Sequence, residues 1–558
     1  MRTSRVGLLP WMLSLGLCHC LLGEGEESAQ GTAAAWSSPP DLAPHSFGII
    51  YHVSGVLSLP YAEVREPFEA WVDLAGGRSR IQYYHGWRPG QVVTYQFSHE
   101  RPFGVGYKVT PETTAAGENV RRCFRVNGTK AHPIRVQSVL PNLEGFQVVG
   151  HEHLGGQKCS VLQNETHWGL RRNVYTLWLA GGPPGLRLPV RYAVRGFSRL
   201  LGSHYDKYQL DYSNFSQHYS PEDVFSLPDR VPCGGVPSPE VKHHMQVNPM
   251  WDFVAREEDR AHRLFEHFRH RHGRRYGDAA ELEHRRRNFL HNLRFIDSHN
   301  RANRPFRLAP NHLTDRTPGE LAALRGRLRS SRPNHGQPFP HEQLANVALP
   351  ESLDWRLYGA VTPVKDQAVC GSCWSFATTG TLEGALFLKM LIDCSWDVGN
   401  FGCDGGLEWQ AFDWIQGHGG LASADSYGPY EGQNGVCHSN TSTAAIRIVG
   451  YVNVPPANPT ALKLALLRHG PVAVNVDASP RSFAFYANGI YYEPQCGHKL
   501  EQLNHAVLLV GYGVLQGQAF WLLKNSWSPL WGNSGYMLLA MKDNDCGVTT
   551  AATYPILE

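Results

Sequence analysis

Long apolar runs are scarce in this 558-residue chain. One lies at the amino terminus, where Met1–Arg5 carries two arginines and an apolar run extends from Val6 to about Gly23. No later run reaches the roughly 18 residues that a membrane-spanning helix needs. We therefore expect residues 1–23 to be a signal peptide and the mature chain to lack a membrane span. An amino-terminal membrane anchor is the weaker alternative, because small and acidic residues follow at once in 23–26.

A large net charge of one sign is also lacking, since the formal charge is only +3. No repeat of basic and aromatic residues indicates nucleic-acid binding, and no motif requires a cofactor or a metal ion. We expect none of these partners. With 42% hydrophobic and 11% aromatic residues, the composition is typical of a globular protein. The length favours about two to four domains.

Cysteine is limited to 12 residues, of which Cys18 and Cys20 would leave with the signal peptide. Passage through the secretory pathway permits disulfides, so we expect a lysosomal or extracellular protein. Four Asn-x-Ser/Thr sequences fit that compartment as glycosylation sites, namely Asn127, Asn164, Asn214 and Asn440. The three cysteines between residues 24 and 235 are an odd number. We expect Cys123 to pair with Cys159, which leaves Cys233 free or bonded to another chain.

Residues 24–235 alternate short apolar or aromatic runs with turn sequences such as Arg88-Pro89-Gly90. This pattern predicts an antiparallel all-β domain. The expected strands are Ser79–Tyr84, Val92–Phe97, Val105–Val109, Val120–Val126, Phe146–Val149, Val174–Leu179 and Leu186–Val194. Since no catalytic constellation occurs there, we favour a binding or shielding module. A connector containing Pro and Gly follows over Pro221 to Asn248, and we expect the linker between domains at residues 236–250.

The stretch from Gln367 to Phe376 contains a candidate nucleophile. Cys373 follows a Gly-Ser turn and opens a helix-compatible run from Trp374 to Leu388, so its sulfur is expected at the positive end of a helix dipole. Such a setting favours the reactive thiolate. Gln367, six residues upstream, could donate to a developing oxyanion together with the backbone N–H of Cys373. Taken alone, Cys370 and Cys373 could instead be a redox pair, or Cys373 a core residue.

A histidine and an asparagine follow at long spacing: His505 lies 132 residues and Asn525 lies 152 residues after Cys373. With Cys-Gly-Ser-Cys-Trp, this order resembles the papain-family cysteine proteases of the cathepsin L type. The resemblance covers about 347–558 and implies an α+β papain-like fold of two subdomains. It implies Cys373 as nucleophile, His505 as general base and acid, and Asn525 as the residue that orients the imidazole. Gln367 would form the oxyanion hole, and Trp527 would shield the Asn–His hydrogen bond.

The same resemblance implies disulfide pairs and substrate-binding residues. Sequence alone allows 15 pairings of six cysteines, and the family pattern selects Cys370–Cys403, Cys394–Cys437 and Cys496–Cys546. Gly405 and Gly406 would hydrogen-bond an extended substrate by strand addition. The main specificity pocket would be lined by Leu407, Leu503, Ala506 and Ala551, with Glu408 at its rim. These apolar residues predict a hydrophobic P2 residue, and no insertion resembles an occluding loop, which favours endopeptidase action.

Residues 251–346 hold 19 Arg against 12 Asp and Glu, a net charge of +7, whereas 347–558 carry a net charge of −7. One helical stripe recurs at steps of three and four residues: Glu281, Arg285, Phe289, Asn292, Ile296 and Asn300. These residue types in this order resemble the inhibitory propeptide helix of cathepsin L-type zymogens. The chain's own propeptide is then its inhibitor. We expect mild acid, acting on carboxylates and on eight histidines in 251–315, to loosen it and permit cleavage near Arg332–Leu349.

The sequence therefore predicts a multidomain zymogen that acts on protein and peptide substrates. An all-β antiparallel domain (24–235) precedes an α-helical propeptide (251–346) and the protease (347–558); this architecture is similar to that of counting-factor-associated and digestive cysteine proteinases. The amino-terminal domain is a candidate to stay associated after cleavage. Two departures stand out: about ten residues are missing between Lys389 and Cys394, and Ser528-Pro529-Leu530 replaces a glycine-containing step. The first keeps an alternative open, a catalytically silent adhesion or matrix protein on the same fold.

Overall fold

The computed structural model describes residues 47–84, 92–99, 102–113, 119–130, 133–182, 187–217, 222–227, 232–235, 250, 254, 259–344, 346–382, 388–438 and 444–558. The expected signal peptide, most of the linker over 236–250 and Asn440 lie outside these ranges. Among the helices within them, none is both long and apolar enough to cross a membrane.

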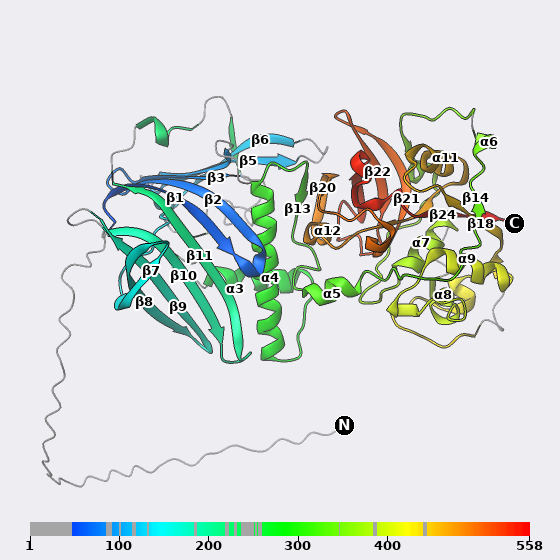
Figure 1. Cartoon of the computed structure of the whole chain (residues 1–558), viewed down its shortest axis with the longest axis horizontal. Coiled ribbons are helices and arrows are strands. Elements are labelled where there is room, and N and C mark those ends of the chain that lie inside the picture. The colour runs from blue at the N-terminus through cyan, green and yellow to red at the C-terminus, as the bar shows by residue number, and fades with distance from the viewer. Residues whose placement is uncertain are drawn as a thin grey trace, which may run out of the picture. The chain divides into compact units, whose positions relative to one another are not determined.

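The amino-terminal region forms one 12-stranded sheet, in the order β12-β6-β5-β4-β3-β2-β1-β11-β10-β9-β8-β7 (Figure 1). Its strands are β1 Ile50–Leu59, β2 Val64–Asp73, β3 Arg78–Tyr84, β4 Val92–His99, β5 Val105–Thr113, β6 Asn119–Asn127, β7 Gln147–Leu154, β8 Gln157–Trp168, β9 Arg171–Gly181, β10 Arg187–Ser198, β11 Ser203–Ser216 and β12 Cys233–Gly235. Every neighbouring pair is antiparallel except β12 with β6. Strict alternation of buried and half-buried residues along β1 shows why such a sequence forms a sheet. The predicted antiparallel β-rich region is therefore confirmed.

The predicted Cys123–Cys159 pair is wrong. Cys123 on β6 instead bonds Cys233 on β12, with Cα atoms 4.4 Å apart. The physical reason is register: β12 runs parallel to β6 and places Cys233 opposite Cys123. Cys159 lies on β8, toward the other end of the sheet, and is a buried free thiol.

Two helices dominate the segment before the protease: α3 (Asp259–Arg271) and the long α4 (Ala279–Arg301). Helix α4 begins after Asp278, whose carboxylate accepts from the backbone N–H of Glu281. An aromatic core holds the two helices together and consists of Phe265, Phe268, Phe289 and Leu293, with Tyr276 packed against it. The segment continues through β13 (Phe306–Leu308), α5 (Pro318–Ala323), β14 (Gln337–Pro338) and α6 (His341–Leu344).

The carboxy-terminal region has a sheet core and a helical core. The sheet core is built on the order β13-β20-β23-β22-β21-β19-β24-β18-β14, and the helical core gathers α7, α8 and α9 around Trp374, Leu391 and Trp414. The strands are β15 Leu353–Asp354, β16 Leu421–Ala422, β17 Ala444–Ile446, β18 Ile448–Val454, β19 Val472–Val476, β20 Tyr486–Tyr491, β21 His505–Leu515, β22 Gln518–Lys524, β23 Tyr536–Ala540 and β24 Ala552–Leu557. The helices are α7 Cys373–Thr381, α8 Leu388–Cys394, α9 Glu408–Gly417, α10 Ala424–Tyr427, α11 Pro459–His469 and α12 Arg481–Ala484.

The two departures from the family pattern are both accommodated within the described residues. Helix α7 ends at Thr381, and α8 resumes at Leu388 and reaches Cys394, which is bonded to Cys437. Cys370–Cys403 and Cys496–Cys546 complete the three bridges that the resemblance implies. Ser528 adopts a φ of 69°, the left-handed region that favours glycine, which explains why a glycine-containing step is more usual there.

Candidate active site

Cys373 is the first residue of α7 and is fully buried. Its sulfur accepts a hydrogen bond of 3.3 Å from the backbone N–H of Gly326, which belongs to the segment before the protease. Burial raises the pKa of the Cys373 thiol to about 12. In this state the thiol is therefore protonated, although it lies at a helix amino terminus.

His505 begins β21, and Asn525 follows β22, the strand paired with β21. Nε2 of His505 lies 2.8 Å from Oδ1 of Asn525. Trp527 covers this pair, with its ring centroid 4.6 Å from that of His505. Burial lowers the pKa of His505 to about 4. Its Nδ1 has no hydrogen-bond partner among the described residues and is the ring nitrogen left available for a proton.

Cys373 and His505 come together because α7 packs on β19 and β21. Cys373 lies in a small apolar cluster with Ala377, Ala473 and Ala506, the residue after His505. Gly326 rather than the imidazole is the hydrogen-bond partner of the sulfur in this state. Cys373 and His505 are thus neighbours, and the backbone N–H of Gly326, from the segment before the protease, is bound to the sulfur of Cys373.

Gln367 is fully buried and its amide points at backbone carbonyls. Nε2 donates to the carbonyl oxygen of Leu324 at 2.9 Å and to that of Cys370 at 2.7 Å. Its Oε1 accepts from the hydroxyl of Ser526 at 2.6 Å, which fixes the orientation of the amide. The Nε2 group of Gln367, which we expect to donate to an oxyanion, is therefore already hydrogen-bonded to the carbonyl oxygen of Leu324.

The segment from Leu324 to Leu328 lies along Gly405 and Gly406. The N–H of Gly406 donates to the carbonyl of Gly326 at 2.8 Å, and its carbonyl accepts from Leu328 at 3.2 Å. A side chain at position 406 would come within 2.6 Å of the Trp374 ring, and one at position 326 within 1.7 Å of the Gly371 carbonyl oxygen. A side chain at position 405 would come within 2.6 Å of the Gly326 carbonyl oxygen, so glycine at 405 and 326 permits the close approach of the two backbones, and glycine at 406 leaves room for the Trp374 ring.

A cavity of about 520 Å³ opens beside Gly406, lined by Leu407 and Ala551 among others. Leu503 and Ala506 are buried but do not line it. Glu408 lines the cavity together with Arg327 and Leu328 of the segment before the protease, and with that segment in place it is only 1% exposed. Its expected position at the rim of the specificity pocket stays a prediction. Burial raises the pKa of its carboxyl group. One carboxylate oxygen lies 3.4 Å from Nδ2 of Asn475, and the other is buried without a hydrogen-bond partner among the described residues.

The stripe on α4 organises the segment before the protease. Phe289 and Ile296 are buried in cores, while Nδ2 of Asn292 donates to the carbonyl of Thr314 at 2.9 Å. Asn300 closes two hydrogen bonds with the backbone of Leu308, at 2.8 and 3.0 Å. The stripe thus ties the chain that follows α4 back onto the helix.

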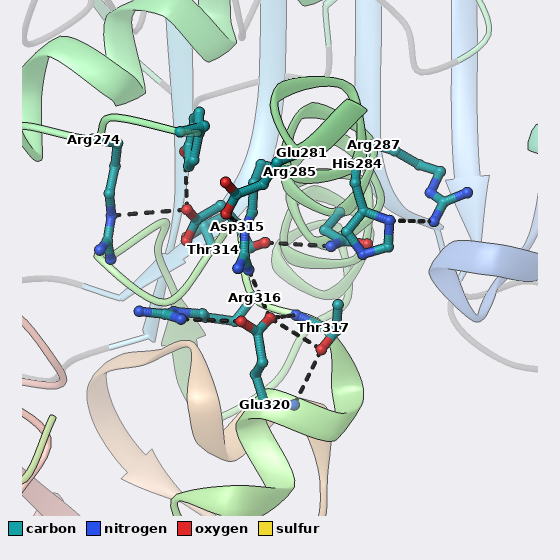
Figure 2. A network of polar contacts seen from close by, with 12 residues as sticks. Arg274, Glu281, His284, Arg285, Arg287, Thr314, Asp315, Arg316, Thr317 and Glu320 are labelled. Atoms are coloured by element: carbon teal, nitrogen blue, oxygen red, sulfur yellow. Dashed lines mark hydrogen bonds and ion pairs between the residues drawn. The ribbon is translucent and has the colours of Figure 1, made fainter. Parts of the chain in front are cut away.

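The charged end of the stripe forms the network drawn in Figure 2. Arg285 lies 3.5 Å from Glu281 and 2.7 Å from Glu320, and Arg316 also pairs with Glu320 at 3.1 Å. Thr317 caps α5 with Glu320 in a reciprocal capping box. Glu320, which sequence reasoning missed, is the hub, and the Thr-Pro-Gly-Glu sequence was the signal for it.

The possible glycosylation sites differ in accessibility. Asn127 at the end of β6 and Asn214 on β11 are exposed, whereas Asn164 on β8 is half-buried and donates to the carbonyl of Glu144 at 3.1 Å. The two exposed asparagines are the better acceptors in this fold.

These features define a protease class. The model of the papain family cysteine proteases matches residues 349–556, and that of the cathepsin propeptide inhibitor domain matches residues 265–321. The chain belongs to the papain family of cysteine proteases and is a papain-like cysteine endopeptidase with a propeptide, the architecture of a zymogen.

Particular relatives are similar over the same half of the chain. Digestive cysteine proteinase 2 of Homarus americanus is 40% identical over 312 residues, covering 52% of this chain and 94% of the relative. Cathepsin K of Mus musculus is 39% identical over 325 residues, covering 55% of this chain and 97% of the relative. The structure of digestive procathepsin L2 proteinase from Tenebrio molitor larval midgut aligns with a TM-score of 0.50 and 34% identity, over 53% of this chain and all of that one.

Proposed function

We propose that this chain hydrolyses peptide bonds through a triad of Cys373, His505 and Asn525, and that it is inactive until the propeptide leaves. One observation carries the proposal: the sulfur of Cys373 is bound by Gly326, while the adjacent imidazole is already oriented by Asn525. When Gly326 departs, Nδ1 of His505 can take the thiol proton, and the resulting thiolate–imidazolium pair is the activated nucleophile.

The reaction follows from the positions of the donors. The Cys373 thiolate attacks the substrate carbonyl carbon, and the C=O π electrons move onto oxygen. Nε2 of Gln367 and the backbone N–H of Cys373 stabilise that oxyanion. His505 then protonates the leaving amine, and water, deprotonated by His505, releases the acyl group and restores the thiol. The Leu324 carbonyl bound to Gln367 supports this role, because it occupies the position that the substrate oxygen would take.

The propeptide would escape cleavage because of its direction in the cleft. Gly326 lies at Cys373, and Arg327 and Leu328, which follow it, lie at Gly406. A substrate would bind its P2 residue at Gly406, and P2 precedes the scissile bond. The propeptide therefore runs opposite to a productive substrate and presents no correctly oriented carbonyl to the sulfur.

The specificity that we propose is a hydrophobic P2 residue. Leu407 and Ala551 line the cavity beside Gly406 and would remove apolar side chains from water. The buried Glu408 places a carboxylate beside these apolar residues, and a basic P2 residue would pair with it without being preferred over leucine.

Mild acid is the proposed trigger for activation. Burial lowers the pKa of several propeptide histidines, His272, His284, His291 and His312, the last to about 4. Protonating them in place is unfavourable, so the folded propeptide loses stability as pH falls below about 6.5. We place cleavage near Arg332–Leu349, and function in the secretory pathway, in the lysosome or outside the cell. We also propose the domain boundaries as 24–235 for the β-rich domain, 251–346 for the propeptide and 347–558 for the protease.

Covalent labelling by an epoxide inhibitor directed at active-site thiols tests the proposal. The acid-processed protein should be labelled at one cysteine and lose peptidase activity in proportion, whereas a Cys373→Ala variant should show neither effect. Absence of labelling and of peptide hydrolysis after complete processing would contradict the proposal and favour a silent scaffold.

A further inference from the structure

Helix α4 has a second, charged stripe that the inhibitory motif does not use. Glu283, Arg294 and Arg301 are spaced by 11 and 7 residues, so they share one face of the helix. At 100° per residue, this face is turned roughly 170° from the face of Glu281, Arg285 and Asn292. Glu283 and Arg301 are less than 9% exposed, so the charged stripe faces protein rather than solvent.

The carboxy-terminal end of this stripe meets β2 of the large sheet. The carboxylate of Glu66 accepts from Nε and Nη2 of Arg301, both at 2.8 Å, and the two side chains are 7% and 8% exposed. The guanidinium of Arg301 also lies over the ring of Tyr83, 5.3 Å from its centroid. Thr94 of β4 donates to the backbone carbonyl of Arg301 at 3.2 Å. This is a bidentate, desolvated ion pair with supporting contacts from two further strands, β3 and β4.

Two more ion pairs continue along the same face. Both oxygens of Asp206 on β11 accept from Nη1 of Arg294 at 2.9 Å. Arg171, at the start of β9, is bonded to Glu283 near the beginning of α4. Acidic groups of the sheet thus meet the two arginines, and a basic group meets the glutamate. Because the sign changes along the helix, only one register pairs all three, which is what a specific docking surface requires.

A peripheral contact joins the sheet region to the protease. Glu63 lies just before β2, and its carboxylate accepts from Nη2 of Arg481 of α12 at 2.8 Å. Its side chain is 63% exposed, so this pair is screened by water and contributes little to binding. The three pairs on α4 are far less exposed than this one.

We propose that the sheet built from β1 to β11 is a docking surface for the propeptide helix, so that sheet and propeptide form one inhibitory body. This body stays together when the linker between them is cut. The sheet also strengthens inhibition, because the propeptide must leave the cleft together with everything bound to its second face. The retention claim does not depend on catalysis; only the inhibition claim depends on the proposed function.

Retention is tested in full-length Cys373→Ala protein with a specific protease site inserted in residues 236–250. After cutting at neutral pH, the sheet fragment should co-elute with the propeptide–protease fragment in size exclusion. The double variant Glu66→Arg/Asp206→Arg should separate, and adding Arg294→Glu/Arg301→Glu should restore co-elution. Glu165→Arg, which breaks the exposed pair with Arg172 within the sheet, is the matched control and should co-elute.

Separation of the unmodified fragments after cutting would overturn retention. Co-elution of the double variant would overturn the claim that these ion pairs hold the sheet on the helix. The variant that exchanges all four charges controls for misfolding. If the double variant separated only because its sheet was misfolded, changing Arg294 and Arg301 on the helix would not restore co-elution. If the exchanged protein is folded by circular dichroism and still separates, the ion pairs do not carry the association.

Inhibition is tested with the native nucleophile. The double variant should process itself faster than the unmodified zymogen at the same mildly acidic pH, by about tenfold or more, since two largely buried ion pairs are lost. Mature enzyme from both proteins should have equal kcat/KM, because neither changed residue belongs to the catalytic machinery. Equal processing rates with intact retention would show that the sheet binds the propeptide without adding to inhibition.

Discussion

The reactivity of Cys373 depends on what lies over its sulfur. Under Gly326 the thiol is dry and its pKa is raised by burial to about 12. The same burial lowers the pKa of His505 to about 4, which keeps the imidazole neutral. Both shifts arise from burial and oppose ion-pair formation, although the hydrogen bond from the N–H of Gly326 by itself lowers the pKa of Cys373. We therefore expect the zymogen thiol to be unreactive as long as the site stays buried.

Gln367→Ala tests the oxyanion donor. Loss of Nε2 should lower kcat by roughly 10²–10³ with little change in KM, because the interaction forms with the developing oxyanion. The measurement is steady-state hydrolysis of a peptide substrate by the processed enzyme. Gln367→Glu is the shape-matched control and should be as impaired as the alanine variant; normal kcat in either variant would remove Gln367 from the oxyanion hole.

Glu408→Gln tests the acid in the specificity cavity. Cleavage of a peptide with arginine at P2 should fall on the order of tenfold, while cleavage of its leucine counterpart stays unchanged, because only a charged P2 side chain interacts with the carboxylate. Burial raises the pKa of Glu408, so the arginine-to-leucine rate ratio of the unmodified enzyme should rise with pH. Glu501→Gln, at another point of the cavity lining, is the control; equal effects of the two variants would contradict the role of Glu408.

Among the elements, the propeptide helices show where acid acts and where it does not. Burial raises the pKa of Glu320, but Arg285 and Thr317 outweigh it and hold that pKa at about 2. The stability from this carboxylate is present above the unfolded pKa near 4.5 and is lost only as pH falls toward 2. The ion pairs that Glu320 makes with Arg285 and Arg316 in Figure 2 therefore survive mild acid, and they cannot be the trigger.

His312→Phe tests the trigger. Burial, Arg274 and His272 lower the pKa of His312 to about 4 from the ordinary 6.5, so the unfolded state binds more protons between these values. Stability of the propeptide then falls as pH drops from 6.5 to 4, by up to about 3 kcal/mol. The variant should need lower pH for half-maximal processing. His270→Asn, an exposed site on α3, should not shift that midpoint; a shift equal to that of His312→Phe would contradict this assignment.

The Cys123–Cys233 disulfide, which joins β6 to β12, can also be tested. It closes a loop of 110 residues, for which the chain-entropy model gives up to about 4.7 kcal/mol of stabilisation. Cys123→Ser/Cys233→Ser should lower the free energy of unfolding of the sheet region, measured by denaturant titration, while the protease region keeps its midpoint. Cys159→Ser is the control, since Cys159 is a free thiol.

The spacing of apolar and turn residues along the chain predicted those helices and strands that are determined by residues close in sequence. The strands from β3 to β7, the stripe on α4 and the helix starting at Cys373 all arise from short-range patterns. The Cys123–Cys233 bridge could not be read this way, because it depends on β12 joining β6 in parallel from 110 residues away. The burial of Glu408 could not be predicted from local spacing either, because Arg327 and Leu328 of the propeptide segment line the same cavity.

At the scale of the whole molecule, one helix links three functions. Through Asn292, α4 binds the chain that leads to the segment over Cys373. Within the propeptide, α4 contributes to the aromatic core. On the side of the sheet, it presents Glu283, Arg294 and Arg301. The charged stripe was missed from the sequence because alternating charges on a helix are ordinarily solvated. The +7 and −7 charges of propeptide and protease regions add a weaker, salt-sensitive attraction.

The most direct test of the account is the alkylation rate of Cys373 by a small neutral reagent, before and after removal of the propeptide at fixed pH. The account predicts very slow modification in the zymogen. In the processed enzyme it predicts modification much faster than that of a small free thiol, with a rate that stays high well below pH 8. Equal rates in the two forms, or a processed enzyme that reacts no faster than the free thiol, would contradict it.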